Sequence, residues 1–97
     1  MTQDEAQIVL EQHRQRIDEL DLGILKLLNE RTVVVQQIGR VKQGVALPIY
    51  EPKREEQVFA NVLGNNPGPL PNDAVKRLFE RIIDEMRTVQ KVQMERK

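Results

Sequence analysis

Apolar residues recur at alternating steps of three and four between residues 8 and 42. The positions that share this spacing are Leu10, His13, Ile17, Leu20, Ile24, Leu27, Arg31, Val34, Ile38 and Val41, called the seam below. Side chains at this spacing lie on one face of an α-helix. Proline is absent from the stretch, and Gly23 and Gly39 are its only weak helix formers, so the pattern predicts a continuous helix over residues 8–42.

Two shorter helices are expected after it. Residues 43–51 have no helical period and are expected to form a loop. Pro52 suits a first helical turn and Gly64 is placed to end a helix, which predicts a helix over 52–63. A proline-rich loop then precedes a helix over 73–95. Its expected apolar face comprises Val75, Leu78, Phe79, Ile82, Met86 and Val89. No segment alternates like a strand, so the fold class is all-α, with a long, a short and a medium helix.

The chain has 97 residues, which is enough for a single helical domain over residues 1–97. A helix over 8–42 would be about 50 Å long, whereas a compact globule of this size is only about 25 to 30 Å across. The two shorter helices together match the first in length, so they are expected to lie end to end along it. That layer leaves one apolar flank exposed, and a two-fold partner usually covers such a flank. An intertwined homodimer is therefore expected.

Charge and composition exclude several classes of function. Fifteen basic residues balance fifteen acidic ones, so the overall field favours neither a nucleic acid nor an anionic membrane as partner. Cysteine is absent, which excludes disulfides and thiolate metal sites. No nucleophile with a base, phosphate-binding glycine loop or metal-ligand spacing is present, so no cofactor or metal is expected. The polar N-terminus lacks a signal-peptide pattern, which favours a cytoplasmic protein.

Two cations on the first helix are the main candidates for binding chemistry. Arg31 occupies a seam position that calls for an apolar side chain, and Lys42 lies eleven residues later. The angular offset is only about 20° and the separation about 16 Å along the axis, with Val35 and Ile38 between them as an apolar floor. This arrangement suits a small dianion. Alternatively, Arg31 extends to solvent and Lys42 is an ordinary lysine at a helix end.

Arg14 lies too far from Arg31 to serve the same site within one chain. If two copies of the long helix pair antiparallel about residue 25, however, Arg14 of one copy falls opposite residue 36 of the other, between Arg31 and Lys42. Arg14 is then a substrate-binding residue supplied by the partner chain. The alternative is a solvated surface arginine.

Glu51, Arg54 and Glu55 gather at the start of the second predicted helix. Acids at that position stabilise the helix dipole, which explains them without a ligand. In the alternative interpretation, Arg54 adds a cation to the site and the two glutamates accept hydrogen bonds from a substrate hydroxyl.

Gln90 continues an apolar stripe of the third helix through Ile83 and Met86, so its amide needs a polar partner. It either donates to a ligand or reaches solvent at a frayed helix end.

The chain resembles the all-α, type II chorismate mutases over nearly its whole length. The segments that carry the resemblance are RQRIDELD at 14–21, LLNER at 27–31, IGRVK at 38–42, EPKRE at 51–55, and LFERIIDE at 78–85 with Gln90. The resemblance implies an intertwined homodimer of three-helix chains that rearranges chorismate to prephenate in phenylalanine and tyrosine biosynthesis. Neither a metal nor a cofactor is needed for this isomerisation.

The resemblance also assigns roles to the candidate residues. Lys42 and Gln90 would face the ether oxygen of the substrate. Arg14 from the partner chain, with Arg31 and Arg54, would hold its two carboxylates. The ring hydroxyl would bind Glu55, with Glu51 beside it, and Ile38 and Ile83 would supply apolar contacts. Met86 stands where some relatives carry a serine that contacts a carboxylate.

Two other functions remain open at the sequence level. The first is elimination of pyruvate from isochorismate on the same fold, which uses the same cations. The second is a non-catalytic helical dimerisation or regulatory module, in which Arg31 and Lys42 have no chemical role. Several free-standing family members depend on another shikimate-pathway enzyme for full activity, so an activating partner is a further expectation.

Overall fold

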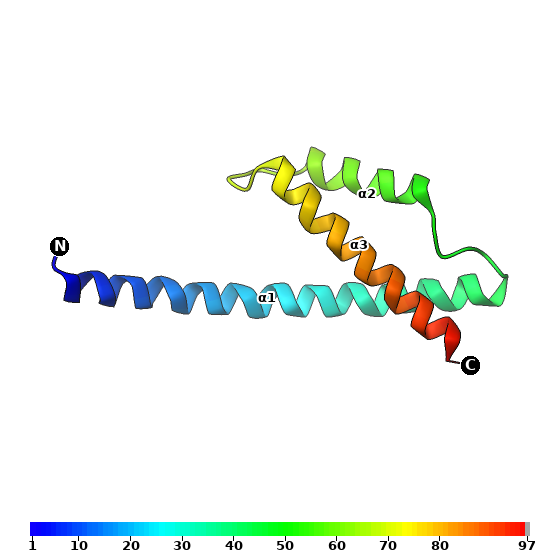
Figure 1. Cartoon of the computed structure of the whole chain (residues 1–97), viewed down its shortest axis with the longest axis horizontal. Helices are drawn as coiled ribbons and strands as arrows, with labels where there is room; N and C mark the ends of the chain where they lie inside the picture. The colour runs from blue at the N-terminus through cyan, green and yellow to red at the C-terminus, as the bar shows by residue number, and fades with distance from the viewer. Residues whose placement is uncertain (97) are drawn as a thin grey trace. The chain divides into compact units, whose positions relative to one another are not determined.

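Three α-helices make up the part of the chain that the computed structural model describes, residues 1–96. They are α1 (Gln3–Gly44), α2 (Pro52–Gly64) and α3 (Asn72–Glu95) (Figure 1). No β-strand occurs in these residues, so the predicted all-α class is confirmed. The chain divides into two compact units, Met1–Val33 and a second unit that begins at Val34. Within residues 1–96, none of the helices carries an apolar stretch of the length that a membrane-spanning helix requires.

A capping box begins α1 at Gln3, five residues before the start expected from the seam. The Glu5 backbone N–H donates to Thr2 Oγ1 at 3.1 Å, and the Thr2 backbone nitrogen donates back to Glu5 Oε1 at 3.4 Å. These two bonds satisfy donors that a helix N-terminus otherwise leaves without partners. The Thr-x-x-Glu spacing is a sequence signal for this start, but it lies outside the seam.

At its other end α1 stops in a left-handed residue. Ala46 has φ 55°, and the Leu47 backbone N–H donates to the Lys42 carbonyl at 2.8 Å. This six-to-one bond is the Schellman arrangement, which usually places glycine in the left-handed position. The chain thereby turns after the end of α1, and residues 47–51 return toward the Lys42 side chain.

The first unit is a helical segment with apolar residues that the single chain leaves uncovered. None of its residues is buried. Ile17 is 55% exposed, Ile24 56% and Leu27 65%, and all three belong to the seam. An apolar stripe of this length is unfavourable in water unless another surface covers it.

In the second unit α2 and α3 pack against each other as an antiparallel hairpin (Figure 1). The expectation that they lie end to end was wrong, because the loop between them reverses the chain. Asn66 organises this loop: its Nδ2 donates to the Leu70 carbonyl at 2.8 Å and to Asn72 Oδ1 at 2.7 Å, and its Oδ1 accepts from the Gly68 N–H at 3.1 Å.

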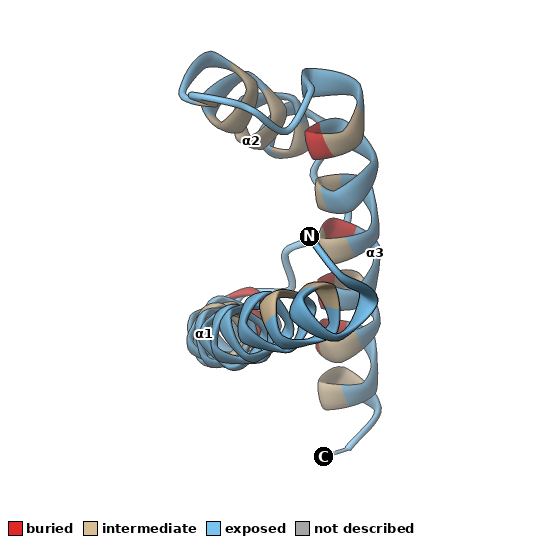
Figure 2. Cartoon of the chain, turned by 90° about the vertical axis from the view of Figure 1, so that its left-hand side faces the viewer, coloured by how far each residue is buried: buried red, intermediate tan, exposed pale blue. Residues whose placement is uncertain are grey.

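One side of α3 carries the core of the second unit, and the opposite side is exposed (Figure 2). Val75, Ile83 and Met86 are its buried apolar side chains. Leu78, which was expected on this side, is instead 54% exposed. No large side chain in residues 1–96 is fully buried, so the core of a single chain is small.

The last turns of α1 pack against α3 through a face that is offset from the seam. Gly39 and Lys42 are buried there and Val35 is half-buried. By contrast, the seam residues Ile38 and Val41 are 45% and 66% exposed. Packing within the second unit therefore uses one face of α1 and leaves the seam uncovered.

Candidate functional site

Lys42 is a buried ammonium at the C-terminal end of α1. The residue is only 7% exposed, although lysine is rarely buried without partners. Its Nζ donates to the Ile49 carbonyl at 3.1 Å and lies 3.5 Å from Glu51 Oε2. Both partners come from the segment that the left-handed turn brings back. An ammonium has three N–H groups, so this arrangement leaves one for a further acceptor.

Gln90 is the second buried polar side chain, and it is 6% exposed. Its Nε2 donates to the Val35 carbonyl of α1 at 3.1 Å. The amide group therefore does not reach solvent at a frayed helix end, as one interpretation of the sequence had it. One N–H of the amide is engaged with the backbone, and its second N–H can serve another acceptor.

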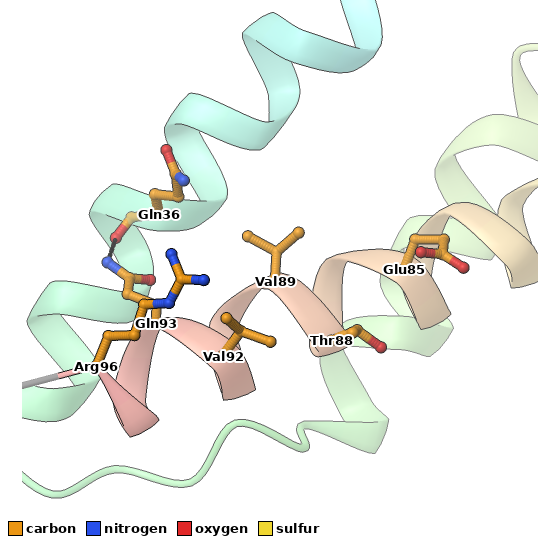
Figure 3. A pocket seen from close by; sticks show the side chains of 7 residues that line it. All are labelled: Gln36, Glu85, Thr88, Val89, Val92, Gln93 and Arg96. Carbon is orange, nitrogen blue, oxygen red and sulfur yellow. Dashed lines mark hydrogen bonds between the residues drawn. The ribbon is translucent and has the colours of Figure 1, made fainter.

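Gln93 repeats this contact one turn later. Its Nε2 donates to the Gln36 carbonyl at 2.9 Å (Figure 3). Its Oε1 is buried without a hydrogen-bond partner among the described residues, and it lies where a Cβ on Gly39 would stand. Gly39 thus allows α3 to approach α1 closely enough for both glutamines to reach the α1 backbone.

An open groove of about 410 Å³ lies beside this contact (Figure 3). Its lining residues are Gln36, Glu85, Thr88, Val89, Val92, Gln93 and Arg96. None of the residues predicted for the site lines it, so this groove is not the predicted substrate site.

Glu51 and Glu55 do not cap α2 through their side chains. The helix begins at Pro52 with Glu51 as N-cap and no capping hydrogen bond from its side chain. Glu51 instead pairs with Lys42, and Glu55, whose side chain is 22% exposed, lies with its Oε2 3.7 Å from Arg87 Nε. Arg54 is exposed and donates to Gln57 Oε1 at 3.3 Å.

Arg87 and Tyr50 were not singled out from the sequence. The Arg87 guanidinium carbon lies 5.5 Å from the centre of the Tyr50 ring, a cation–π distance. The available signal was position: Arg87 stands four residues after Ile83 and three before Gln90, beside the apolar stripe of α3.

The apolar residues predicted for the site differ in their environment. Ile83 and Met86 are buried, at 7% and 9% exposure, on the same side of α3 as Gln90. Ile38 is 45% exposed in the single chain.

Arg14 and Arg31 belong to the first unit. Arg14 is exposed, and Arg31 is half-buried and has interaction partners within the chain. Their roles in a site with the second unit remain predictions.

The second unit thus holds Lys42 beside Glu51, Gln90 bound to the α1 backbone, and Glu55 beside Arg87. Two buried N–H donors and two carboxylates can orient a small anion and stabilise charge that develops on an oxygen. Residues 1–96 contain no group of three or more histidines, aspartates or glutamates arranged to hold a metal ion.

Comparison with known proteins places the chain in a family. The family model for chorismate mutase type II matches residues 13–91. The chain belongs to this family. The resemblance inferred from the five sequence segments and Gln90 is therefore confirmed, and the matched range extends from His13 to one residue past Gln90.

Individual members of the chorismate mutase family match much of the chain. A bifunctional chorismate mutase/prephenate dehydratase of Neisseria gonorrhoeae is 40% identical over 79 residues, which are 81% of this chain and 21% of that protein. A chorismate mutase of Methanocaldococcus jannaschii is 30% identical over 84% of each sequence. The structure of chorismate mutase form II from Thermus thermophilus superimposes with a TM-score of 0.82 at 36% identity, covering 84% of this chain and 93% of that one. The chain spans about a fifth of the length of the bifunctional relative and most of the length of the other two.

Proposed function

We propose that this chain catalyses the rearrangement of chorismate to prephenate, as a homodimer in the cytoplasm. The observation that carries the proposal is the pair of buried side-chain donors, Lys42 and Gln90, in a member of the type II chorismate mutase family. Gln90 binds the α1 backbone at Val35, about two helical turns before Lys42. Each donor is held by a backbone carbonyl and retains N–H capacity for a substrate oxygen.

The rearrangement breaks the ether C–O bond while a C–C bond forms in the same step, so no proton is transferred and no nucleophile is needed. Negative charge grows on the ether oxygen as its bond stretches. Donors fixed in advance at that oxygen stabilise the transition state more than the ground state. Lys42 and Gln90 fill this role, because their burial excludes competing water and their backbone contacts restrict their rotation.

The remaining candidates bind the ends of the substrate. Arg31 and Arg54, with Arg14 of a second copy, hold the two carboxylates and keep the flexible substrate compact, which lowers the entropic part of the barrier. Glu55 and Glu51 accept from the ring hydroxyl. The Met86 side chain offers no hydroxyl or amide donor to a carboxylate, so the arginines carry that recognition.

The homodimer is supported by the exposed apolar seam. Leu27 in the first unit and Val41 in the second are each more than 60% exposed in the single chain. A second copy paired antiparallel along α1 would cover this stripe and bring in Arg14.

A pathway partner is supported by the bifunctional relatives, which join a chorismate mutase to a prephenate dehydratase. An enzyme that uses prephenate is therefore the first candidate to test for activation of this chain.

The direct test is to incubate the purified chain with chorismate, follow its ultraviolet absorbance, and convert the product with acid to phenylpyruvate, which identifies prephenate. We expect catalytic loss of chorismate with a matching yield of prephenate. Intact chorismate, together with release of pyruvate from isochorismate, would overturn the mutase proposal in favour of the lyase.

A further inference from the structure

Arg87 joins α3 to α2 and to the loop before it. Its Nε lies 3.7 Å from Glu55 Oε2, its Nη2 lies 3.4 Å from Asp84 Oδ1, and its guanidinium stands over the Tyr50 ring. The side chain is 40% exposed, but its Nε is buried and has no hydrogen-bond partner among the described residues. A buried donor without an acceptor is costly. The Glu55 carboxylate lies just beyond hydrogen-bonding distance of this nitrogen.

Glu55 needs such a partner more than Glu51 does. Its side chain is 22% exposed, against 45% for Glu51, and a carboxylate that gives up water on burial needs a cation or a hydrogen-bond donor in its place. Glu51 already lies beside Lys42. Among the described residues, Glu55 is paired with Arg87. The approach is made through Oε2, which leaves Oε1 as an acceptor.

We propose that Arg87 is a positioning residue for substrate recognition, acting through Glu55. The inference rests on the proposed function, in which Glu55 accepts from the ring hydroxyl of a dianionic substrate. Bringing a dianion toward a carboxylate is unfavourable, and the guanidinium of Arg87 offsets that repulsion. The same contact fixes the carboxylate so that one oxygen faces Arg87 and the other faces the hydroxyl. Tyr50 and Asp84 hold the guanidinium in place.

A purely structural role makes a different prediction. If Arg87 only joins α2 to α3 through Glu55, removing it lowers the melting temperature but leaves kcat/KM of the folded protein unchanged. If it acts through Glu55, the two residues are coupled and their effects on kcat/KM are not additive.

The experiment is a double-mutant cycle with Arg87→Met and Glu55→Gln in the full chain, in which kcat and KM for chorismate and the melting temperature are measured. Arg87→Met keeps most of the side-chain length and removes the charge. We expect it to lower kcat/KM about tenfold when Glu55 is present and less than about twofold in the Glu55→Gln background. Equal losses in the two backgrounds, or no loss in either, would overturn the proposal.

Two further variants complete the design. Arg81→Met removes an arginine from the exposed side of α3, where it pairs with Glu85, and should leave kcat/KM unchanged. If Arg87→Met does not fold, Arg87→Lys replaces it in the cycle; its smaller loss should again be confined to the background that retains Glu55, and a loss of the same size without Glu55 overturns the proposal. Inactivity of the unaltered chain on chorismate would overturn the proposed function itself, whereas an active chain with additive variants would overturn only the role of Arg87.

Discussion

Lys42 and Gln90 are buried polar residues that are fixed by one hydrogen bond each and keep further N–H groups for a ligand. Each donates to a main-chain carbonyl, of Ile49 and Val35 respectively, and each side chain has more N–H groups than this contact requires. The carbonyl fixes the donor, and the remaining N–H groups are what a substrate oxygen can use. Burial strengthens such a donor because little water competes for it.

Replacing either donor should therefore slow the reaction strongly. We expect Lys42→Ala and Gln90→Ala each to lower kcat at least about a hundredfold, which corresponds to about 3 kcal/mol for one oxyanion-type donor. The measurement is steady-state turnover of chorismate, with the oligomeric state checked by size-exclusion chromatography.

Lys91→Ala is the matched control, because Lys91 is an exposed neighbour of Gln90 on the same helix. It should retain full turnover. Near-normal turnover in Lys42→Ala or Gln90→Ala would remove that residue from the proposed catalytic pair.

Among the elements, α1 has two distinct faces, the exposed seam and the face that packs on α3. The sequence pattern revealed only the seam. The regular spacing from Leu10 to Val41 predicted a helix correctly, but its seam is the exposed face. The face that packs on α3 within the second unit runs through Val35, Gly39 and Lys42, a set with one ordinary apolar member. Periodicity could not identify it, because its contacts are hydrogen bonds from glutamine side chains to backbone carbonyls.

The hairpin of α2 and α3 was missed for a related reason. Helix lengths allowed an end-to-end layer, and the direction of the chain after Gly64 depends on how Asn66 binds the loop backbone. Composition identified a turn-rich loop without giving its geometry. Similarly, the acids at 51 and 55 were recognised as a cluster, but only the structure shows that they face Lys42 and Arg87.

Gly39→Ala tests the contact between α1 and α3. The added Cβ would overlap Gln93 Oε1, so the Gln93 side chain must move and its bond to the Gln36 carbonyl is strained or lost. We expect a loss of about 1 to 2 kcal/mol of unfolding free energy. We also expect reduced turnover, because Gln90 lies one turn before Gln93 on α3 and also packs beside Gly39. Urea denaturation and chorismate turnover measure the two effects.

Gly23→Ala is the matched control, since a Cβ on Gly23 meets nothing within 4 Å. Alanine favours a helix interior by about 0.5 to 1 kcal/mol over glycine, so this variant should be at least as stable as the unaltered chain. Equal stability of the two variants would show that Gly39 is not a point of close approach.

For the whole molecule, the small core and the exposed seam belong together. A single chain buries few apolar side chains, while Ile17, Ile24 and Leu27 remain more than half exposed. Chain length and the seam predicted self-association from the sequence. We propose that the second copy completes the site as well as the core, because Arg14 is too far along the helix from Arg31 to serve the same substrate within one chain.

The decisive measurement is complementation between two inactive variants, Arg14→Ala and Lys42→Ala. Each homodimer lacks one required residue in both sites. A mixed dimer, in contrast, has one site with Lys42 of one chain and Arg14 of the other. We predict that each variant alone is inactive on chorismate and that the co-refolded mixture regains about a quarter of the activity of the unaltered chain, as random pairing of a two-site dimer requires. A mixture as inactive as its components would contradict a mutase site shared between two copies of this chain.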